Sequence, residues 1–364
     1  MRVVSVESFA LPEVALVRVR TDEGAEGWGQ VAPYHARTTV EVLHRQVAPH
    51  ALGRNALAAA DLVDEIPELE HKFRGSHLFR ALAGLDTALW DLRGKVEGRS
   101  VRELLGGTAT SVRAYAASVR RDIAPEEEAQ RLARLRDLHG FSAFKIRIGK
   151  ECGHDGDEWP GRTEAVVETV RRALGDGVSL LVDANSAYTP ARAIEVGRML
   201  EEHGVVHYEE PCPWWRQDWT REVTETLSLD VAGGEQDWDE VAWESMTATR
   251  AVDVVQPDVL YAGGLTRALR FAALAAERGL PCTPHAANHS LVVVFTLHLL
   301  ASIPNAGSYL EFSIEPDEDY PWQAGMFEPR PRVVDGRVAV PDGPGWGVAI
   351  SPDWLARADY AVTA

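Results

Sequence analysis

Six acidic or imidazole side chains recur along the second half of the chain at a nearly constant spacing. The intervals between them are 26, 26, 23, 27 and 26 residues, close to the length of one strand, one helix and two short loops. Each of them also ends a short run of strand-forming residues. Parallel strands that close into a (β/α)8 barrel bring their C-terminal ends to one face, so the spacing predicts that all six surround one pocket. They are Asp183, Glu209, Glu235, Asp258, His285 and Glu311.

A carboxylate at a strand end can instead cap the helix that follows, because it accepts hydrogen bonds from free N–H groups and suits the helix dipole. For one such residue, helix capping and a functional role are about equally good interpretations. Six residues at the same phase of a barrel favour an active site, because catalytic residues gather at the C-terminal ends of barrel strands.

Size and charge narrow the class of protein. The 364 residues fit a barrel of about 250 residues plus a smaller domain. The net charge of −18 argues against nucleic acid or an anionic membrane as partner. We find neither a signal-peptide pattern nor a long apolar stretch, and therefore expect a cytoplasmic protein. The three cysteines form no CxxC pair, which disfavours a disulfide framework or a thiolate metal site.

Hydrophobic periodicity divides the chain into three parts. Residues 1–110 begin with three alternating strand patterns and continue with helical ones over 36–52, 57–70 and 80–98, which predicts an α+β domain. Residues 111–320 alternate between strands, beginning with 111–119 and 142–149, and helices, as a barrel does. Residues 321–364 are irregular and expected to pack back on the first domain. The predicted barrel helices are 124–139, 163–175, 189–203, 217–227, 237–248, 264–279 and 290–302.

Two cations stand on the second predicted barrel strand. Lys145 and Arg147 are two residues apart, hence on the same side of the strand, and alternate with apolar residues. Inward barrel positions usually carry branched apolar residues. Long cations on an exposed face could snorkel into solvent, but carboxylates on the next strands favour a functional role.

The chemistry of the six residues indicates proton abstraction beside a carboxylate. Asp183, Glu209 and Glu235 supply only hard oxygen ligands, which suit Mg²⁺, and a bound divalent ion can stabilise an enediolate. Asp258 and His285 form a possible carboxylate-oriented general base or acid. Glu311 could donate a hydrogen bond to the enediolate if burial among negative groups keeps it protonated.

Short strings at these positions resemble the enolase superfamily, and in particular its mandelate racemase subgroup. They are FKIRIG, LVDAN, YEEP, AGGE, QPD followed by GGLT, TPH and YLEF. The resemblance covers essentially the whole chain and implies an N-terminal α+β capping domain and a (β/α)7β barrel. It also implies that Asp183, Glu209 and Glu235 bind Mg²⁺, and that the protein is a homo-oligomer. Asp258 and His285 would be the acid–base pair, and Glu311 would donate a hydrogen bond to the enediolate. Base catalysis by Lys or His beside Mg²⁺ is general in this superfamily.

One departure from the family pattern bears on the reaction. The family usually carries Lys-x-Lys on the second strand, whereas this chain has Lys145-Ile146-Arg147. Arginine stays protonated and is a poor base. This disfavours racemisation, which needs an acid and a base on opposite faces of the α-carbon. Elimination of water needs only one group that removes the α-proton and an acid that protonates the leaving hydroxyl, and His285 can serve as both. We therefore predict a dehydratase of an aldonate or aldarate, with His285 in both roles and Lys145 as the alternative base.

Two other functions remain open at this stage: a racemase or epimerase of a hydroxy or amino carboxylate, and a binding or scaffold protein with an inactive barrel. Two segments of the capping domain, 28–39 and 73–80, are expected to close the pocket over a small carboxylate substrate. The loop 149–163 is long for its position and could also cover it. The predicted substrate-binding residues are Tyr34, His35, Arg74 and Asn185.

Overall fold

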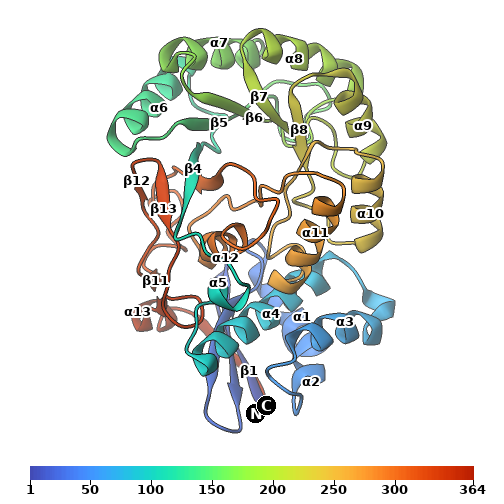
Figure 1. Cartoon of the computed structure of the whole chain (residues 1–364), viewed down its shortest axis with the longest axis vertical. Coiled ribbons are helices and arrows are strands. Elements are labelled where there is room, and N and C mark those ends of the chain that lie inside the picture. Colours follow the sequence, from blue (N-terminus) through green and yellow to red (C-terminus); the bar gives the residue numbers. More distant parts are fainter.

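The computed structural model describes residues 1–364 and places a barrel beside a smaller α+β domain (Figure 1). The barrel occupies the upper part of the view, and the sheet and helices of the first hundred residues lie below it. The two termini lie side by side at the lower end. None of the helices combines the length and apolar character needed to cross a membrane.

The smaller domain is built on an antiparallel sheet in the order β15-β1-β2-β3. Its strands are β1 (Val3–Ala10), β2 (Ala15–Thr21), β3 (Glu26–Gln30) and β15 (Asp359–Thr363). Thus the first three strands expected from alternation are confirmed, and the last strand of the chain completes the sheet by pairing with β1. The long helix α4 (Ser76–Glu97) packs on β2 and β3 and buries a continuous apolar stripe.

The segment predicted as one helix over 36–52 is broken. It forms α1 (Ala36–Val42), a π-helical turn η1 (Leu43–Val47) and α2 (Ala48–Ala51). Pro49 has no N–H to donate to the preceding turn, which accounts for the change of hydrogen-bond pattern there. The domain is completed by α3 (Ala59–Leu69), the 3₁₀ turn η2 (His71–Phe73) and α5 (Val101–Leu104).

Parallel strands form the barrel, and its last strand, β10, pairs with its first, β4. This closure confirms the predicted (β/α)7β architecture. The strands are buried on both sides, as in other parallel sheets covered by helices. They are β4 (Ser111–Ala117), β5 (Ala143–Arg147), β6 (Ser179–Asp183), β7 (Val205–Glu209), β8 (Asp230–Gly233), β9 (Val254–Val255) and β10 (Leu310–Ser313).

The strand expected to end at His285 is reduced to a single residue. Cys282 makes isolated bridges to Val255 and Ala306, and no longer ladder forms there. Pro281 and Pro284 flank this point, and neither has the N–H that a ladder needs. The chain nevertheless passes between β9 and β10, so His285 still reaches the face of the barrel where the strands end.

Seven helices surround the barrel, each within three residues of its predicted bounds. Together with the strands they bury a large apolar core and a smaller apolar cluster beneath α10 and α11. They are α6 (Pro125–His139), α7 (Arg162–Leu174), α8 (Pro190–Glu202), α9 (Gln217–Thr226), α10 (Glu240–Ala248), α11 (Leu265–Glu277) and α12 (Leu291–Leu300).

The segment after β10 returns towards the smaller domain. Its hairpin of β12 and β13 pairs with the edge of β4, and its last strand joins the antiparallel sheet through β1. The remaining elements of this segment are short. They are β11 (Phe327–Glu328), β12 (Val333–Val334), β13 (Arg337–Ala339), β14 (Ala349–Ile350) and α13 (Pro352–Leu355).

A buried aspartate on α4 joins the two parts. Asp86 is fully buried and accepts hydrogen bonds from the N–H (3.1 Å) and hydroxyl of Thr266 at the start of α11. Burial raises the pKa of Asp86 to about 6. Gly264 lies against it: a Cβ there would stand 2.3 Å from a carboxylate oxygen of Asp86. Any larger residue at position 264 would therefore separate α4 from α11.

We expect Asp86→Ala to destabilise the protein by about 1–3 kcal/mol, because it leaves the buried N–H and hydroxyl of Thr266 without an acceptor. Urea denaturation followed by circular dichroism measures the effect. Asp137→Ala, at an exposed position that pairs with Arg136 within α6, is the matched control and should cost less than 1 kcal/mol. Equal stability of the two variants would show that the Asp86 contacts do not join the domains.

Candidate active site

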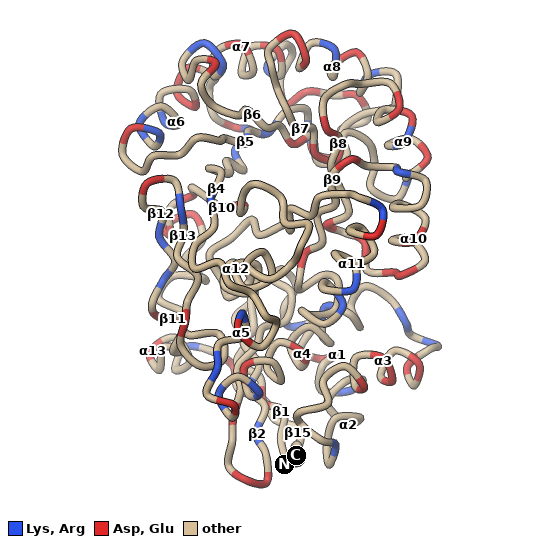
Figure 2. The backbone as a smooth tube through the Cα atoms, viewed as in Figure 1, with Lys and Arg blue, Asp and Glu red and all other residues tan.

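Carboxylates and cations from neighbouring strand ends meet inside the barrel. The parallel register pairs Arg147 with Asp183 across β5 and β6, and Asp183 with Glu209 across β6 and β7. Glu235 follows β8 and is also buried. Figure 2 shows acidic and basic residues at β5 to β8 that border the barrel interior, in addition to those on the outer helices. The regular spacing in the sequence thus becomes one charged cluster.

Lys145 is the cation at the centre of this cluster. Its Nζ lies 2.7 Å from Glu209 and 2.6 Å from Glu311, and 3.7 Å from Asp183. The side chain has no exposed surface. Burial alone lowers the pKa of Lys145, but Glu209 and Glu311 outweigh it and raise this pKa well above its usual value. Lys145 is therefore a bound cation beneath the cavity.

Glu209 has two further neighbours. Gln256 Nε2 donates to it at 2.8 Å, and His207 Nε2 lies 3.7 Å away. Although burial raises the pKa of Glu209, Lys145 and His207 bring it well below its usual value. His207 and Gln256 each stand two residues before a predicted site residue. Alternation along a strand would have assigned them to the same side of the barrel.

Two arginines share the amide oxygen of Asn185. Arg147 contacts Asp183 and donates to Asn185, and Arg121 donates to the same oxygen at 2.8 Å. Burial and the charge of Arg147 lower the pKa of Arg121 to about 10. Arg121 was not predicted, although its place just after the first barrel strand puts it on the face where the other strands end.

Asp258 orients His285. The imidazole Nδ1 lies 2.7 Å from Asp258 Oδ2, while the other oxygen of Asp258 accepts the N–H groups of Leu260 and Tyr261. The free Nε2 lies 3.5 Å from Glu235. Burial lowers the pKa of His285, but Glu235, Glu311 and the bond to Asp258 raise it to about 10. With the surrounding carboxylates charged, the imidazole holds a proton.

Glu311 differs from the expectation that burial keeps it protonated. Burial does raise its pKa, but Lys145, followed by His285, lowers it below the usual value. The carboxylate also accepts the N–H of Ala286 at 2.9 Å. The ion pair with Lys145 therefore favours the charged carboxylate of Glu311 over the protonated form expected from burial alone.

The three residues expected to bind Mg²⁺ have the oxygen ligands that this ion prefers, but their side chains do not converge on one point. Asp183 and Glu209 are held by Arg147 and Lys145, so no three acidic, histidine or cysteine side chains form a ready ligand set. Glu235 Oε2, in contrast, is buried without a hydrogen-bond partner. Such an orphaned oxygen, beside two further carboxylates and no thiolate, matches the preference of Mg²⁺ for oxygen.

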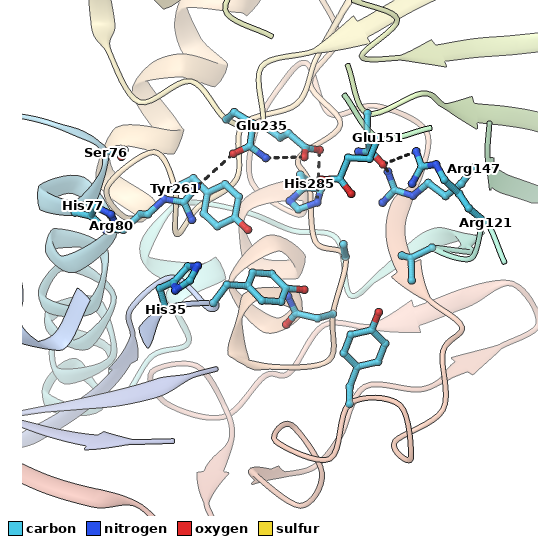
Figure 3. Close-up of a pocket in the computed structure, with 17 residues that line it drawn as sticks. His35, Ser76, His77, Arg80, Arg121, Arg147, Glu151, Glu235, Tyr261 and His285 are labelled. Atoms are coloured by element: carbon cyan, nitrogen blue, oxygen red, sulfur yellow. Dashed lines mark hydrogen bonds and ion pairs between the residues drawn. The ribbon is translucent and has the colours of Figure 1, made fainter. Parts of the chain in front are cut away.

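A cavity of about 600 Å³ lies above this cluster. Arg147, Glu235 and His285 reach its wall, whereas Lys145 does not. Figure 3 shows that residues of the barrel and of the smaller domain line it together. The smaller domain contributes Tyr34, His35, Ser76, His77 and Arg80.

Of the four predicted substrate-binding residues, three line the cavity: Tyr34, His35 and Asn185. All three have left-handed backbone conformations, with φ of 62°, 50° and 43°, a strained geometry often found at functional sites. Arg74 does not line the cavity; its side chain is exposed and stacks on the ring of Phe79. The loop 149–163 contributes Glu151.

Arg80 lines the cavity, whereas Arg74 had been predicted to do so. Helix α4 begins at Ser76, and Ser76, His77 and Arg80 share the face of α4 that looks into the cavity. Residues three and four apart lie on one helix face, so a correct start for this helix would have identified Arg80. The sequence alone placed the start of the helix at residue 80 and hid this pattern.

Comparisons with known proteins match both parts of the chain. Residues 2–106 match the family described as mandelate racemase / muconate lactonizing enzyme, N-terminal domain, and residues 127–354 match the family described as enolase C-terminal domain-like. Arabinonate dehydratase of Saccharolobus solfataricus is 28% identical over 93% of this chain and 88% of its own. D-galactarolactone cycloisomerase of Agrobacterium fabrum is 32% identical over 93% and 89%.

Solved structures give the same fold over the full length. The crystal structure of a candidate racemase from Roseobacter denitrificans has 57% sequence identity and a TM-score of 0.98, and covers 100% of both chains. A mandelate racemase/muconate lactonizing protein from Paracoccus denitrificans, solved with magnesium, has 28% identity and a TM-score of 0.90 and covers 99% of both chains.

Proposed function

We propose, on the premise that this chain belongs to the enolase superfamily and its mandelate racemase subgroup, that it dehydrates a sugar acid to a 2-keto-3-deoxy acid. The names of two groups of relatives, arabinonate and galactonate dehydratases, support this reaction class. The sugar acid would be an aldonate or aldarate with hydroxyl groups on carbons 2 and 3.

One observation carries the proposal: of the three proton-bearing side chains of the charged cluster, Lys145, Arg147 and His285, only His285 both lines the cavity and can give its proton up. Lys145 has no exposed surface. Arg147 reaches the cavity, but a guanidinium remains protonated at any useful pH. A single acid–base group suits elimination better than racemisation, which needs groups on both faces of the α-carbon.

In this dehydration, each residue of the cluster would have a separate role. His285, held by Asp258, acts in its neutral form: once it has released to solvent the proton that it holds in this structure, it takes the α-proton, and the pair of electrons from the C–H bond forms an enediolate. The same imidazole then protonates the hydroxyl leaving carbon 3, which departs as water in a syn elimination. Lys145 and Arg147 stabilise the negative charge of the enediolate, and Lys145 also neutralises Glu311. The resulting enol becomes the keto acid by taking a proton at carbon 3 and losing the proton of its hydroxyl on carbon 2.

We further propose that Asp183, Glu209 and Glu235 hold Mg²⁺. When bound, this ion supplies a Lewis acid for the substrate carboxylate and offsets the negative charge of the cluster. The orphaned oxygen of Glu235 and the magnesium in the Paracoccus structure support the assignment.

Removal of one of these carboxylates should weaken Mg²⁺ binding. We expect Glu235→Gln to raise the Kd for Mg²⁺ in calorimetry by at least about tenfold, because an anionic oxygen becomes a neutral amide. Glu244→Gln, on the exposed side of α10, should leave the Kd unchanged. Equal Mg²⁺ binding by both variants would contradict the assignment, as would full turnover by the wild-type protein after exhaustive chelation.

The reaction is tested with a panel of four- to six-carbon aldonic and aldaric acids and a reagent that traps keto acids. At least one member should yield a trapped 2-keto-3-deoxy acid in the presence of Mg²⁺. If all members are inert while a hydroxy or amino carboxylate is epimerised, the dehydratase proposal is wrong.

The second candidate function is racemisation or epimerisation. The identity of 57% to the candidate racemase favours it, and so does the contact of Lys145 with Glu311, which places a second proton-bearing group near His285. In that case Lys145 would have to become accessible to the substrate and lose its proton.

A further inference from the structure

The cavity carries positive charge at two separated ends. Three guanidinium groups line it, against only two carboxylates, Glu151 and Glu235. In Figure 3, Arg80 lies on one side of the cavity and Arg121 and Arg147 lie on the other, with Glu235 and His285 between them. This arrangement is notable in a chain whose net charge is −18.

The end near Arg147 is suited to the reacting carboxylate of the substrate. It adjoins Asp183 and the ammonium group of Lys145. A carboxylate bound there would bring its α-carbon towards His285. The rest of the carbon chain would then extend past His285 towards the smaller domain, where Arg80 is the cation.

Arg80 is held in place but has no anionic partner. Its guanidinium lies 3.6 Å from the centre of the Tyr261 ring and donates to Gln236 at 3.3 Å. Gln236 in turn donates to Glu235 at 3.1 Å. No carboxylate lies within ion-pair distance of Arg80, whereas Arg93, further along the same helix, pairs with Glu97.

These contacts orient the planar guanidinium of Arg80 relative to the catalytic centre, and they leave its positive charge without an anionic partner. The other groups lining this end are hydroxyl, imidazole or amide: Tyr34, His35, Ser76, His77 and Gln236. A half-buried guanidinium that has no carboxylate of its own, and is oriented by neutral groups, is suited to bind a carboxylate of a ligand through two parallel hydrogen bonds.

We propose that the substrate is a dicarboxylate, an aldarate, whose carboxylate remote from the reacting carbon binds Arg80. This inference rests on the proposed dehydration and narrows its substrate class. The neutral hydroxymethyl end of an aldonate would leave the guanidinium of Arg80 unpaired, so the cavity discriminates against aldonates of the same length and stereochemistry.

The test compares six-carbon aldarates with the aldonates that share their stereochemistry. Turnover is measured for the wild-type protein, Arg80→Gln, Arg80→Lys and the control Arg93→Gln, all with Mg²⁺. Binding of the same acids is measured by calorimetry in a His285→Asn background, where no turnover competes. Circular dichroism establishes that each variant is folded.

We expect the wild-type protein and Arg93→Gln to prefer an aldarate by at least tenfold in kcat/KM. Arg80→Gln should lose about 10- to 100-fold for the aldarate, the effect of a lost charged hydrogen bond, and little for the aldonate. Arg80→Lys should recover part of the loss, because it keeps the charge without the fork. The calorimetric Kd values should follow the same order.

Two failures are distinguishable. If aldonates are dehydrated as well as aldarates and Arg80→Gln affects both alike, the dicarboxylate inference is overturned and dehydration stands. If aldarates bind through Arg80 but the wild-type protein eliminates water from none of them, the inference stands and the proposed function is overturned. Absence of binding by every acid overturns both.

Discussion

His285→Asn should reduce dehydration by about 10²- to 10⁴-fold, the usual contribution of a general acid or base. Exchange of the α-proton with solvent should fall equally, because the same imidazole performs both steps. Asparagine retains a polar side chain of similar size but cannot carry a proton between substrate atoms. The rates are measured by trapping the keto acid and by nuclear magnetic resonance in D₂O.

His71→Asn, at an exposed position in the smaller domain, is the matched control and should have wild-type rates. A His285→Asn variant that still exchanges the α-proton at a near-normal rate, but does not dehydrate, would show that another group removes this proton. Lys145 would then be the base and His285 only the acid.

Lys145→Met should strongly reduce both the activity and the free energy of unfolding. It removes the cation that lies 2.7 Å from Glu209 and 2.6 Å from Glu311. Loss of one partner of a buried ion pair costs about 3–5 kcal/mol, and here two carboxylates lose their partner. Mg²⁺ should restore part of the stability, because it would offset the negative charge left in the cluster.

Denaturation by urea with and without Mg²⁺ measures this effect, with Lys150→Met as control, since Lys150 is exposed and forms no ion pair. A Lys145→Met variant as stable as the control at neutral pH would mean that the carboxylates are not charged, and that Lys145 is not the centre of the ion cluster.

The spacing of six residues was sufficient to predict the barrel and the side of it on which they meet. Parallel strands leave little freedom: once Asp183 and Glu209 each end a strand, the ladder brings them side by side. The pairing of His285 with Asp258 could be predicted for the same reason, since both follow neighbouring strands.

Features that depend on contacts between distant side chains could not be predicted in this way. The charge of Glu311 is determined by Lys145, which lies more than 160 residues earlier in the chain. The choice of Arg80 over Arg74 depends on where α4 begins. The loss of the ladder around Cys282 is local, and the two prolines beside it could have revealed it.

The most direct test of dehydration is nuclear magnetic resonance of the wild-type protein with a sugar acid and Mg²⁺ in D₂O. A dehydratase should form a 2-keto-3-deoxy acid with one deuterium at carbon 3, and formation of this product should require His285. Deuterium appearing at the α-carbon of recovered substrate or of its epimer, without any keto acid, would contradict dehydration and identify the protein as a racemase or epimerase.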